Sequence, residues 1–383
     1  MKKRWLSITA ALCVCVAFMS GCQSASEPSS PSSETSGQSN SELVFSGEEG
    51  TTSIVGEPSS PDTSGSQSIT AGLDVFNVRI YGANGNGQGD DSGAIQQAVD
   101  AASSAGGGIV YLPHGEYAVK STILKKAKVS MIGDNMQSTI LKWVGDSDGV
   151  MIDTSNQALW GTSIENLSFT TASVSGVTGI LGGSTFKVYN SAIGTFKNLS
   201  FSSLDYGIRG DAVAYESRGI GIFDCNFENI FVSGAKKGIW LCGSGNTIVH
   251  PRVVGCDAGL VLDYLSGESI DGVHVIGGIF IQNKVDVFIP NGTFLRPTNF
   301  VGTWFEQSSE GIVKVLMPGS RVQTLVFRDC MLSTNDDVPS ILDFSNIGDG
   351  NVIVDGCSIM AKNPSIVPPQ YGGKLAERDN YIC

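Results

Sequence analysis

The sequence predicts an all-β fold, a single-stranded parallel β-helix with a capping helix at its N-terminal end. Short apolar strands recur from residue 162 onward at irregular steps of roughly 22 to 32 residues, which is typical of stacked repeats. Glycine is abundant, at 48 of 383 residues, and stands mainly between these strands, where tight corners favour it. A helical pattern is confined to one short segment, so the coils must stack through parallel strand ladders.

The first 22 residues have the order of an export signal. Lys2, Lys3 and Arg4 precede an apolar run that ends at Phe18, and this run is too short to span a membrane. The stretch 19–22, Met-Ser-Gly-Cys, resembles a bacterial lipobox, in which Cys22 would carry a lipid. An ordinary cleaved signal peptide is the alternative.

Residues 23–72 are rich in Ser, Gly, Thr, Pro and Glu, and they hold too few apolar side chains to form a core. We expect a disordered tether, with an average span of about 40 Å for a flexible chain of this length. The predicted organisation is therefore an exported lipoprotein on the outer face of the cell membrane, with the membrane contacted only through the lipid. Residues 73–383 form the β-helix domain, divided into 73–145 for the cap and first coils, 146–361 for the remaining coils and 362–383 for a C-terminal tail.

The cap is predicted from residues 76–119. An alternating strand, "FNVRIYG", precedes a helix start at Asp91 or Ser92, and apolar residues then follow at helical spacing. These are Ala94, Ile95, Ala98, Val99 and Ala102. A helix with one apolar face can cover the open end of a repeat stack. The glycines of "GNGQGDD" do not have the spacing of a dinucleotide fingerprint, so we interpret Asp90 and Asp91 as helix caps, with metal binding as the alternative.

The coils are predicted from eight segments that each hold two short apolar strands around a small or polar turn. These segments are 162–169, 194–201, 220–227, 246–255, 269–278, 295–305, 323–332 and 350–359. A third short strand, usually after glycine, lies between them, as in "YGIRGD", "KGIWLCG", "AGLVLD" and "EGIVKVL". Leucine-rich repeats would show a fixed leucine frame, and propellers would show long antiparallel strands, so the β-helix fits better.

Charge and cysteine content limit the function. The formal net charge of −13 makes nucleic acid and anionic membrane surfaces poor partners. No Cys-x-x-Cys pair occurs, which argues against zinc. Cys225, Cys330 and Cys357 follow similar residues, and we expect them to stack in one frame as small buried side chains rather than as disulfides.

Residues 76–119 resemble the N-terminal signature of the pectate-lyase-like superfamily, which includes rhamnogalacturonase, epimerase-like proteins and phage tailspikes, and residues 129–143 continue the resemblance. It implies a right-handed β-helix that acts on acidic or complex polysaccharides, although lyases, hydrolases, epimerase-like proteins and inactive binders share the scaffold. The Asn-Thr-Asp and Gly-His-Gly stretches of polygalacturonase-type hydrolases are absent here, as is the Arg-x-Pro-x-x-Arg element of calcium-dependent pectate lyases. No catalytic residue is therefore carried over, and calcium is the one cofactor that the resemblance leaves open.

A candidate site lies on the third strand of successive coils, where strict alternation would turn one set of side chains outward. This set consists of Arg209, Asp211, Trp240, Asp263, Asp286, Phe288 and Lys314. Trp240 and Phe288 would stack on sugar rings, while Arg209 or Lys314 would pair with a uronate carboxylate. The three aspartates are candidate catalytic acids, since coils about 4.8 Å apart can hold carboxylates at glycosidase separations. The alternative is that an exposed face simply carries charges.

A second candidate is Glu306, which shares a local frame with Glu228 and follows Trp304, a candidate substrate-binding side chain. Glu306 could instead bond to a turn backbone. His250 and His274 are candidate bases, or else ordinary polar positions.

The sequence therefore predicts a surface-anchored, carbohydrate-active protein that cleaves an acidic polysaccharide as a lyase or glycoside hydrolase. We expect it to be a monomer and to have no nucleic-acid partner. The alternative is a noncatalytic glycan-binding or spacer protein of the cell envelope. An enzyme needs acid and base groups that converge in a groove, whereas a binder needs only the aromatic face.

Overall fold

The computed structural model describes residues 74–155, 159–182, 193–210, 221–263, 269–291, 294–316, 321–344, 350–360 and 365–382. The predicted signal, the predicted lipidation site Cys22, the predicted tether and the candidate acid Asp211 lie outside these residues. Within the described part, no helix has the length and apolarity needed to cross a membrane.

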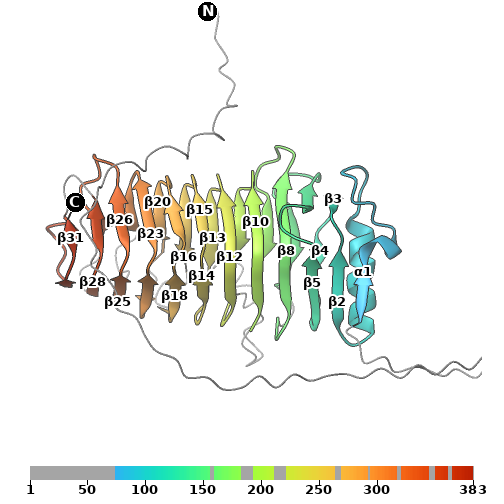
Figure 1. Cartoon of the computed structure of the whole chain (residues 1–383), viewed down its shortest axis with the longest axis horizontal. Helices are drawn as coiled ribbons and strands as arrows, with labels where there is room; N and C mark the ends of the chain where they lie inside the picture. The colour runs from blue at the N-terminus through green and yellow to red at the C-terminus, as the bar shows by residue number, and fades with distance from the viewer. Residues whose placement is uncertain are drawn as a thin grey trace, which may run out of the picture. The chain divides into compact units, whose positions relative to one another are not determined.

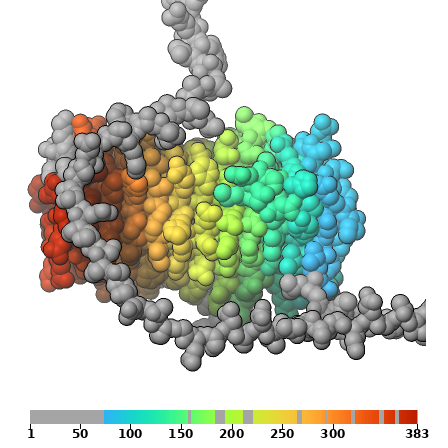
Figure 2. Space-filling view, in the orientation of Figure 1, coloured from blue at the N-terminus to red at the C-terminus, as the bar shows by residue number. Residues whose placement is uncertain are grey.

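The described chain from residue 74 onward folds as a right-handed parallel β-helix, as the sequence predicts (Figure 1). Every strand pair is parallel, and each strand bonds to the equivalent strand of the next coil. Successive coils therefore follow one another along the stack in sequence order (Figure 2).

A nine-stranded sheet holds the third strand of each coil. Its strands are β4 (Ile123–Leu124), β7 (Val150–Asp153), β9 (Thr178–Leu181), β11 (Tyr206–Arg209), β13 (Lys237–Leu241), β16 (Ala258–Leu262), β20 (Val285–Ile289), β24 (Gly311–Val315) and β27 (Leu342–Asp343).

A 22-stranded sheet holds the paired strands, arranged in two columns. The first column contains β1 (Val75–Asn77), β2 (Gly108–Leu112), β5 (Val129–Gly133), β14 (Thr247–Val249), β18 (Val273–Ile276), β22 (Thr298–Val301), β25 (Arg321–Arg328), β28 (Gly350–Asp355) and β30 (Lys374–Arg378), with β17 (Ser269–Ile270) and β21 (Phe294–Leu295) at its start. The second contains β3 (Gly115–Val119), β6 (Thr139–Trp143), β15 (Arg252–Val254), β19 (Ile279–Ile281), β23 (Trp304–Ser308), β26 (Met331–Thr334), β29 (Ser358–Met360) and β31 (Tyr381–Ile382). Three long strands span both columns, namely β8 (Ser163–Thr171), β10 (Thr195–Ser202) and β12 (Asn226–Ser233).

The capping helix is α1 (Ser92–Ser104), which follows a short 3₁₀ turn, η1 (Val78–Tyr81). Ile95, Ala98, Val99 and Ala102 are fully buried against the first coils. Asp90 Oδ1 accepts a hydrogen bond from Ser92 N at 3.0 Å, at the start of the helix. The two Asp91 oxygens accept from Asn84 N at 2.7 Å and Ala118 N at 3.2 Å, so this carboxylate fastens the cap to strand β3 instead of capping α1.

The core is built from like side chains stacked at the coil spacing. The ring centroids of Phe169 and Phe201 lie 4.8 Å apart, and those of Phe196 and Phe227 lie 4.9 Å apart. At one corner, Asn166, Asn198 and Asn229 adopt left-handed backbone angles and donate amide to amide at 2.8 and 2.9 Å. These ladders repeat the same interaction over two or three successive coils and so hold neighbouring coils together.

The cysteines only partly follow the expectation. Cys225, Cys242, Cys256, Cys330 and Cys357 are buried free thiols, and Cys330 N contacts Cys357 Sγ at 3.4 Å across adjacent coils. However, Cys225 directly precedes β12 in the first column, whereas the other two precede second-column strands. The expected common frame is therefore wrong for Cys225, because similar flanking residues occur at both columns. The coils also continue beyond residue 361, since β30 and β31 pair with β28 and β29.

Candidate functional site

The outward row predicted on the nine-stranded sheet is partly present. Arg209, Trp240, Val261, Phe288 and Lys314 are Cα partners on successive strands. The first predicted residue, Arg209, and the last, Lys314, therefore lie on one line that runs along the stack.

A second outward row lies three residues earlier on the same strands and includes Tyr206 and Lys237. The Lys237 Nζ lies 3.2 Å from the Trp240 ring centroid, and the Arg209 guanidinium lies 5.5 Å from it. Trp240 is 8% exposed, because these cations and Tyr206 cover it. Trp240 is therefore a support for the cations rather than an open platform for a sugar ring, while Phe288 remains half-buried at the surface.

A groove of about 410 Å³ runs over these rows, and we call it the lysine groove. Its charged lining consists of Lys236, Lys237, Lys284 and Lys314 with Asp257 and Glu310, and its rings are Tyr206 and Phe288. Four lysines against two acids give this groove a positive lining in a protein that is acidic as a whole.

The charged residues at the start of these strands alternate in sign from one coil to the next. Asp205, Lys236, Asp257, Lys284 and Glu310 each directly precede a residue of the row that contains Tyr206 and Lys237. Lys236 Nζ contacts Asp205 Oδ2 at 2.9 Å, and Lys284 Nζ contacts Asp257 Oδ1 at 2.7 Å. These hydrogen bonds raise the pKa of both lysines, which therefore stay charged. Opposite charges on neighbouring strands also favour this register.

The predicted catalytic aspartates do not face the groove. Asp286 is fully buried and accepts hydrogen bonds from Asn283 Nδ2 at 2.8 Å and from Ser308 Oγ, and burial raises its pKa to about 8. Asp263 is 4% exposed and accepts from Asn291 Nδ2 at 2.5 Å. The expectation of exposure is wrong, because outward positions on these strands lie three residues apart and strict alternation fails.

The second predicted cluster lies on the other sheet, away from this row. Trp304 is 46% exposed on β23, and Glu306 is half-buried beside it. Glu228 belongs to the first column, where it pairs with Lys197 at 2.9 Å, so it does not share a frame with Glu306.

The two histidines lie at different places in the coils. His250 occupies a left-handed corner, with its backbone N donating to Ile276 O at 2.9 Å. His274 Nδ1 contacts Asn299 Nδ2 of the next coil at 3.0 Å. Among the described residues, no group of three or more His, Cys, Asp or Glu side chains is placed to hold a metal ion, so calcium is assigned no site.

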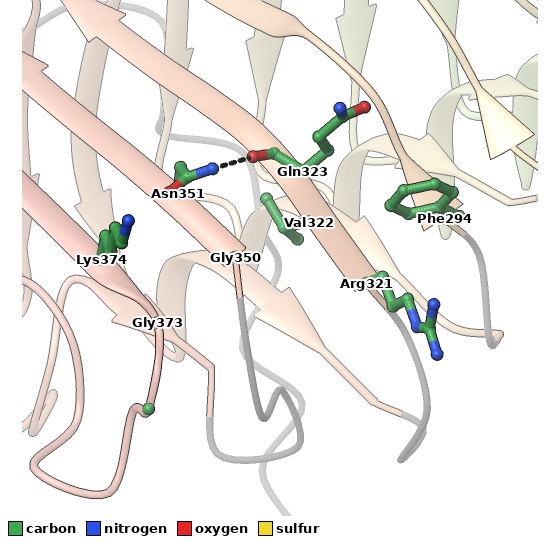
Figure 3. A pocket seen from close by; sticks show the side chains of 9 residues that line it. Phe294, Arg321, Val322, Gln323, Gly350, Asn351, Gly373 and Lys374 are labelled. Atoms are coloured by element: carbon green, nitrogen blue, oxygen red, sulfur yellow. Dashed lines mark hydrogen bonds between the residues drawn. The ribbon is translucent and has the colours of Figure 1, made fainter.

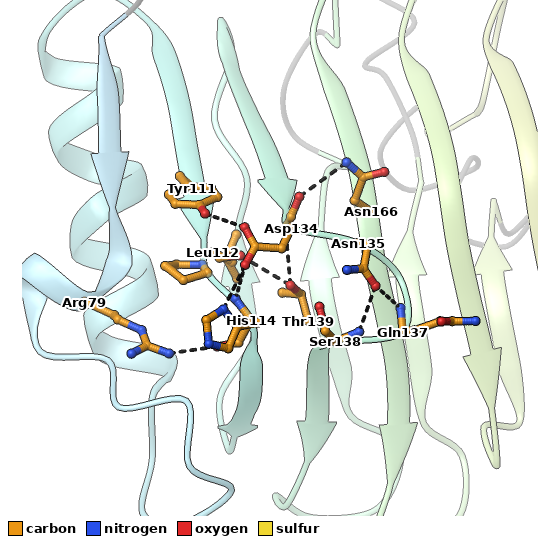
Figure 4. A network of polar contacts seen from close by, with 12 residues as sticks. Arg79, Tyr111, Leu112, His114, Asp134, Asn135, Gln137, Ser138, Thr139 and Asn166 are labelled. Atoms are coloured by element: carbon orange, nitrogen blue, oxygen red, sulfur yellow. Dashed lines mark hydrogen bonds and ion pairs between the residues drawn. The ribbon is translucent and has the colours of Figure 1, made fainter.

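Sequence reasoning missed a polar network next to the cap (Figure 4). Asp134 accepts hydrogen bonds from the Tyr111 hydroxyl and from His114 N at 2.7 Å, and its Oδ2 lies 3.1 Å from His114 Nδ1. The Tyr111 bond is the main reason that the pKa of Asp134 is lowered. Arg79 Nη2 donates to His114 O at 2.7 Å, so the network ties the turn after β2 to the cap. The Pro-His-Gly stretch after β2 is the signal that marks this turn.

Sequence reasoning also missed Lys236, Lys237, Lys284, Asp257 and Glu310. The available signal was a charged residue directly before each third strand, as in "AKKG", "CDAG" and "SEG".

Comparison with known families confirms the resemblance inferred from residues 76–119. Residues 75–250 match the model of the family described as rhamnogalacturonase A/epimerase, pectate lyase-like.

Curated relatives match over short segments. A mannuronan C5-epimerase of Azotobacter vinelandii is 46% identical over 81 residues, covering 19% of this chain and 6% of the relative. Alginate lyase 7 of the same organism is 44% identical over 80 residues, covering 19% and 9%. Plasmin and fibronectin-binding protein A of Streptococcus pneumoniae is 36% identical over 104 residues, covering 25% and 14%. The chain thus spans a small part of each of these relatives.

Solved structures match over most of the chain. The A-module of an A. vinelandii mannuronan C5-epimerase superposes with a TM-score of 0.53 at 18% identity, covering 81% of this chain and 95% of the module. The tailspike of Acinetobacter baumannii phage AM24 gives 0.54 at 11% identity, covering 80% and 54%. At these identities, the likeness shows the fold alone.

Proposed function

From the premise that this chain carries a β-helix of the pectate-lyase-like family, we propose that it binds and acts on a uronate-containing polysaccharide in the lysine groove. The observation that carries the proposal is the groove itself, in which four lysines and two aromatic rings lie on one sheet face. A polyuronate presents a carboxylate and an apolar ring face in each residue. Lysine ammonium groups and aromatic rings bind these two features.

The groove supports binding along the stack. Neighbouring coils are about 4.8 Å apart, so a polymer parallel to the stack meets a new coil with each short advance. Phe288 is the ring that can contact a sugar, while Lys237 and Lys314 lie on strands before and after it. The cations on the Trp240 ring are held in place by that ring, so less side-chain entropy is lost on binding.

Elimination is the reaction that the groove supports best. Asp257 and Glu310, the acids of its lining, are both paired with lysines, and the buried Asp263 and Asp286 cannot reach a polymer. β-Elimination instead needs a cation to neutralise the uronate, a base to remove the proton on the carbon beside the carboxyl group, and a proton for the glycosidic oxygen that leaves as its C–O bond breaks and the C=C bond forms. Tyr206 supplies a hydroxyl in the groove, next to the Arg209 guanidinium, which lies 5.0 Å from its ring. We assign Tyr206 as the base of this proposed reaction, and the proton that its oxygen takes up passes on to the leaving glycosidic oxygen.

Noncatalytic glycan binding is the second candidate. The ion pairs of Lys284 with Asp257 and of Lys314 with Glu310 favour it, since they leave the acids of the groove engaged in structural contacts. In both cases the domain would be displayed at the cell surface through a lipid on Cys22 and the tether of residues 23–72, which is a proposal from the sequence.

The test uses the full chain on a panel of polyuronates and neutral glycans, with the ultraviolet absorbance of unsaturated products, reducing ends and retention on immobilised polymer as readouts. We expect Tyr206→Phe to abolish the absorbance while binding is kept, since only a hydroxyl is lost. Phe288→Ala should weaken binding about two- to tenfold, the equivalent of one aromatic contact. Lys126→Gln, a lysine in an exposed ion pair with Asp100, is the matched control.

Retention that depends on Phe288 without any product would establish the binder instead of the enzyme. Reducing ends without absorbance would indicate hydrolysis. Binding and turnover that are the same in Phe288→Ala, Lys284→Gln and the control would refute the lysine groove as the site.

A further inference from the structure

A second cleft lies in the C-terminal coils, on the 22-stranded sheet (Figure 3). It has a volume of about 390 Å³, and its side chains include Phe294, Arg321, Gln323, Asn351 and Lys374. None of its lining residues belongs to the lysine groove, which lies on the nine-stranded sheet. We call it the C-terminal cleft.

The cations of this cleft are available to a ligand. Arg321 and Lys374 are exposed, and neither forms an ion pair with an acid of the described residues. In the lysine groove, by contrast, Lys236, Lys284 and Lys314 all have carboxylate partners. Two cations without such partners, at one cleft of an acidic protein, favour an anionic ligand.

The strand register sets the spacing of these cations. Phe294 and Arg321 are partners on adjacent coils, Val322 is the partner of Gly350 on the next coil, and Asn351 is the partner of Lys374 on the coil after that. Arg321 and Lys374 are therefore two coils apart, about 10 Å along the stack. A single carboxylate is too small to bridge them, so the two cations suit anionic groups on neighbouring units of a polymer.

The floor of the cleft is bare backbone. A Cβ at Gly350 would lie 2.2 Å from Val322 O, and one at Gly373 would lie 2.6 Å from Gly350 O, so neither position accepts a side chain. The register also shifts between Val322 and Leu325, where β25 has two residues and β28 has one. Such bulges redirect side chains and are common next to binding sites.

The rim offers groups that recognise sugars. The Phe294 ring forms one wall, with the Arg296 guanidinium 5.7 Å from its centroid and anchored to Asp271 Oδ2 at 3.3 Å. Asn351 Nδ2 donates to Gln323 O at 2.8 Å, which orients the Asn351 amide and leaves its oxygen at the cleft (Figure 3). An aromatic wall, amide groups and spaced cations together match a chain of acidic sugars.

We propose that the C-terminal cleft is a second, independent binding site for an acidic oligosaccharide that carries anionic groups on neighbouring units. One group pairs with Arg321 and a second pairs with Lys374. A ring between them contacts the amides of Gln323 and Asn351, and the unit beyond Arg321 contacts the Phe294 ring. Because the cleft shares no residue with the lysine groove, this site does not depend on the function proposed there. Two sites on one chain would hold a polymer by avidity.

The experiment is calorimetric titration of the full chain with an oligogalacturonate of defined length, and with an uncharged cello-oligosaccharide of equal length. We expect Arg321→Gln and Lys374→Gln each to weaken one class of sites about tenfold, since each removes one charge-assisted contact. Arg252→Gln removes an exposed cation from β15 and is the matched control, with no expected change. The same substitutions in a Phe288→Ala background show whether the remaining binding belongs to the cleft.

Equal affinity and stoichiometry in Arg321→Gln/Lys374→Gln and in Arg252→Gln would overturn the proposal, whether or not the lysine groove binds. Loss of uncharged and charged ligands alike would overturn the assignment of an acidic ligand. Arg321-dependent binding of a single-stranded oligonucleotide, without binding of the oligogalacturonate, would also overturn it. Circular dichroism of each variant confirms that the fold is retained.

Discussion

Lys125 is expected to make the stability of this protein depend on pH in the alkaline range. Its side chain is 1% exposed, and its Nζ donates to Thr162 Oγ1 at 2.8 Å inside the first coils. Burial lowers the pKa of Lys125 from 10.5 to about 7, and no carboxylate contributes to its hydrogen bonding. The folded chain thus releases the Lys125 proton at a much lower pH than the unfolded chain.

The sign and size of the effect follow from this shift. A base whose pKa is depressed on folding contributes full stability above its unfolded pKa, and this contribution is lost as the pH falls through its folded pKa. A pH of 8 lies two and a half units below the unfolded pKa of 10.5. At about 1.4 kcal/mol per unit, the fold has lost about 3 kcal/mol of stability at this pH. Below pH 7 the cost reaches its full size, about 5 kcal/mol.

The perturbation is Lys125→Met, which keeps the length of the side chain and removes its charge. We expect the free energy of unfolding of the variant to exceed that of the native chain, and we call this difference the margin. Between pH 7 and pH 9.5 the margin should narrow by about 1.4 kcal/mol per pH unit. Loss of the hydrogen bond to Thr162 reduces the margin by the same amount at every pH. Urea denaturation across this range measures the margin. Lys126→Met, at an exposed lysine paired with Asp100, is the control.

A margin between Lys125→Met and the native chain that stays constant from pH 7 to pH 9.5 would refute the reasoning. So would a margin that changes equally in Lys126→Met. Other titrating groups, such as Asp286, are common to all three chains and cancel in the comparison.

Three further predictions concern the fold and the anchor. Asp286→Asn should gain a few kcal/mol of stability relative to the native chain as the pH rises from about 4 to about 8. An acid whose pKa is raised on folding stabilises the fold below its unfolded pKa, and this contribution is lost as the pH rises to its folded pKa, here about 8. The same pH dependence of denaturation in both chains would contradict this prediction. Ile95→Asp should lower the free energy of unfolding by a few kcal/mol, since it places a charge beneath α1, and an unchanged thermal midpoint would show that the helix does not protect the first coil. Cys22→Ala should move the protein from the membrane fraction into the medium, and unchanged fractionation would end the lipoprotein hypothesis.

The architecture could be predicted from the sequence because it depends on local chemistry repeated in every coil. Glycine and asparagine accept the left-handed corners, short apolar strands bury their side chains, and stacked rings such as Phe169 and Phe201 repeat at the coil spacing. The capping helix was equally accessible, since the stripe containing Ile95 and Val99 shows its buried face directly. The corners, the strands and the helix are each determined within a few residues of chain, and the ring stacks follow when the same strand pattern recurs in the next coil.

The candidate sites could be predicted only in part, because they depend on how each strand bends and which residues face each other across coils. Strict alternation correctly placed Phe288 and Lys314 outward but placed Asp286 on the same face, where the strand in fact turns it into the core.

Contacts between coils are also set by loops of unequal length, so sequence spacing does not show which charges meet. Register between coils produces the row of alternating charges from Asp205 to Glu310 and the burial of Lys125. It also places Arg321 and Lys374 at one cleft. Local sequence therefore determined the shape of each coil, and the stacking of coils decided which side chains share a surface. Residues that are neighbours on adjacent parallel strands are separated by a variable number of residues, so no fixed spacing in the sequence identifies them.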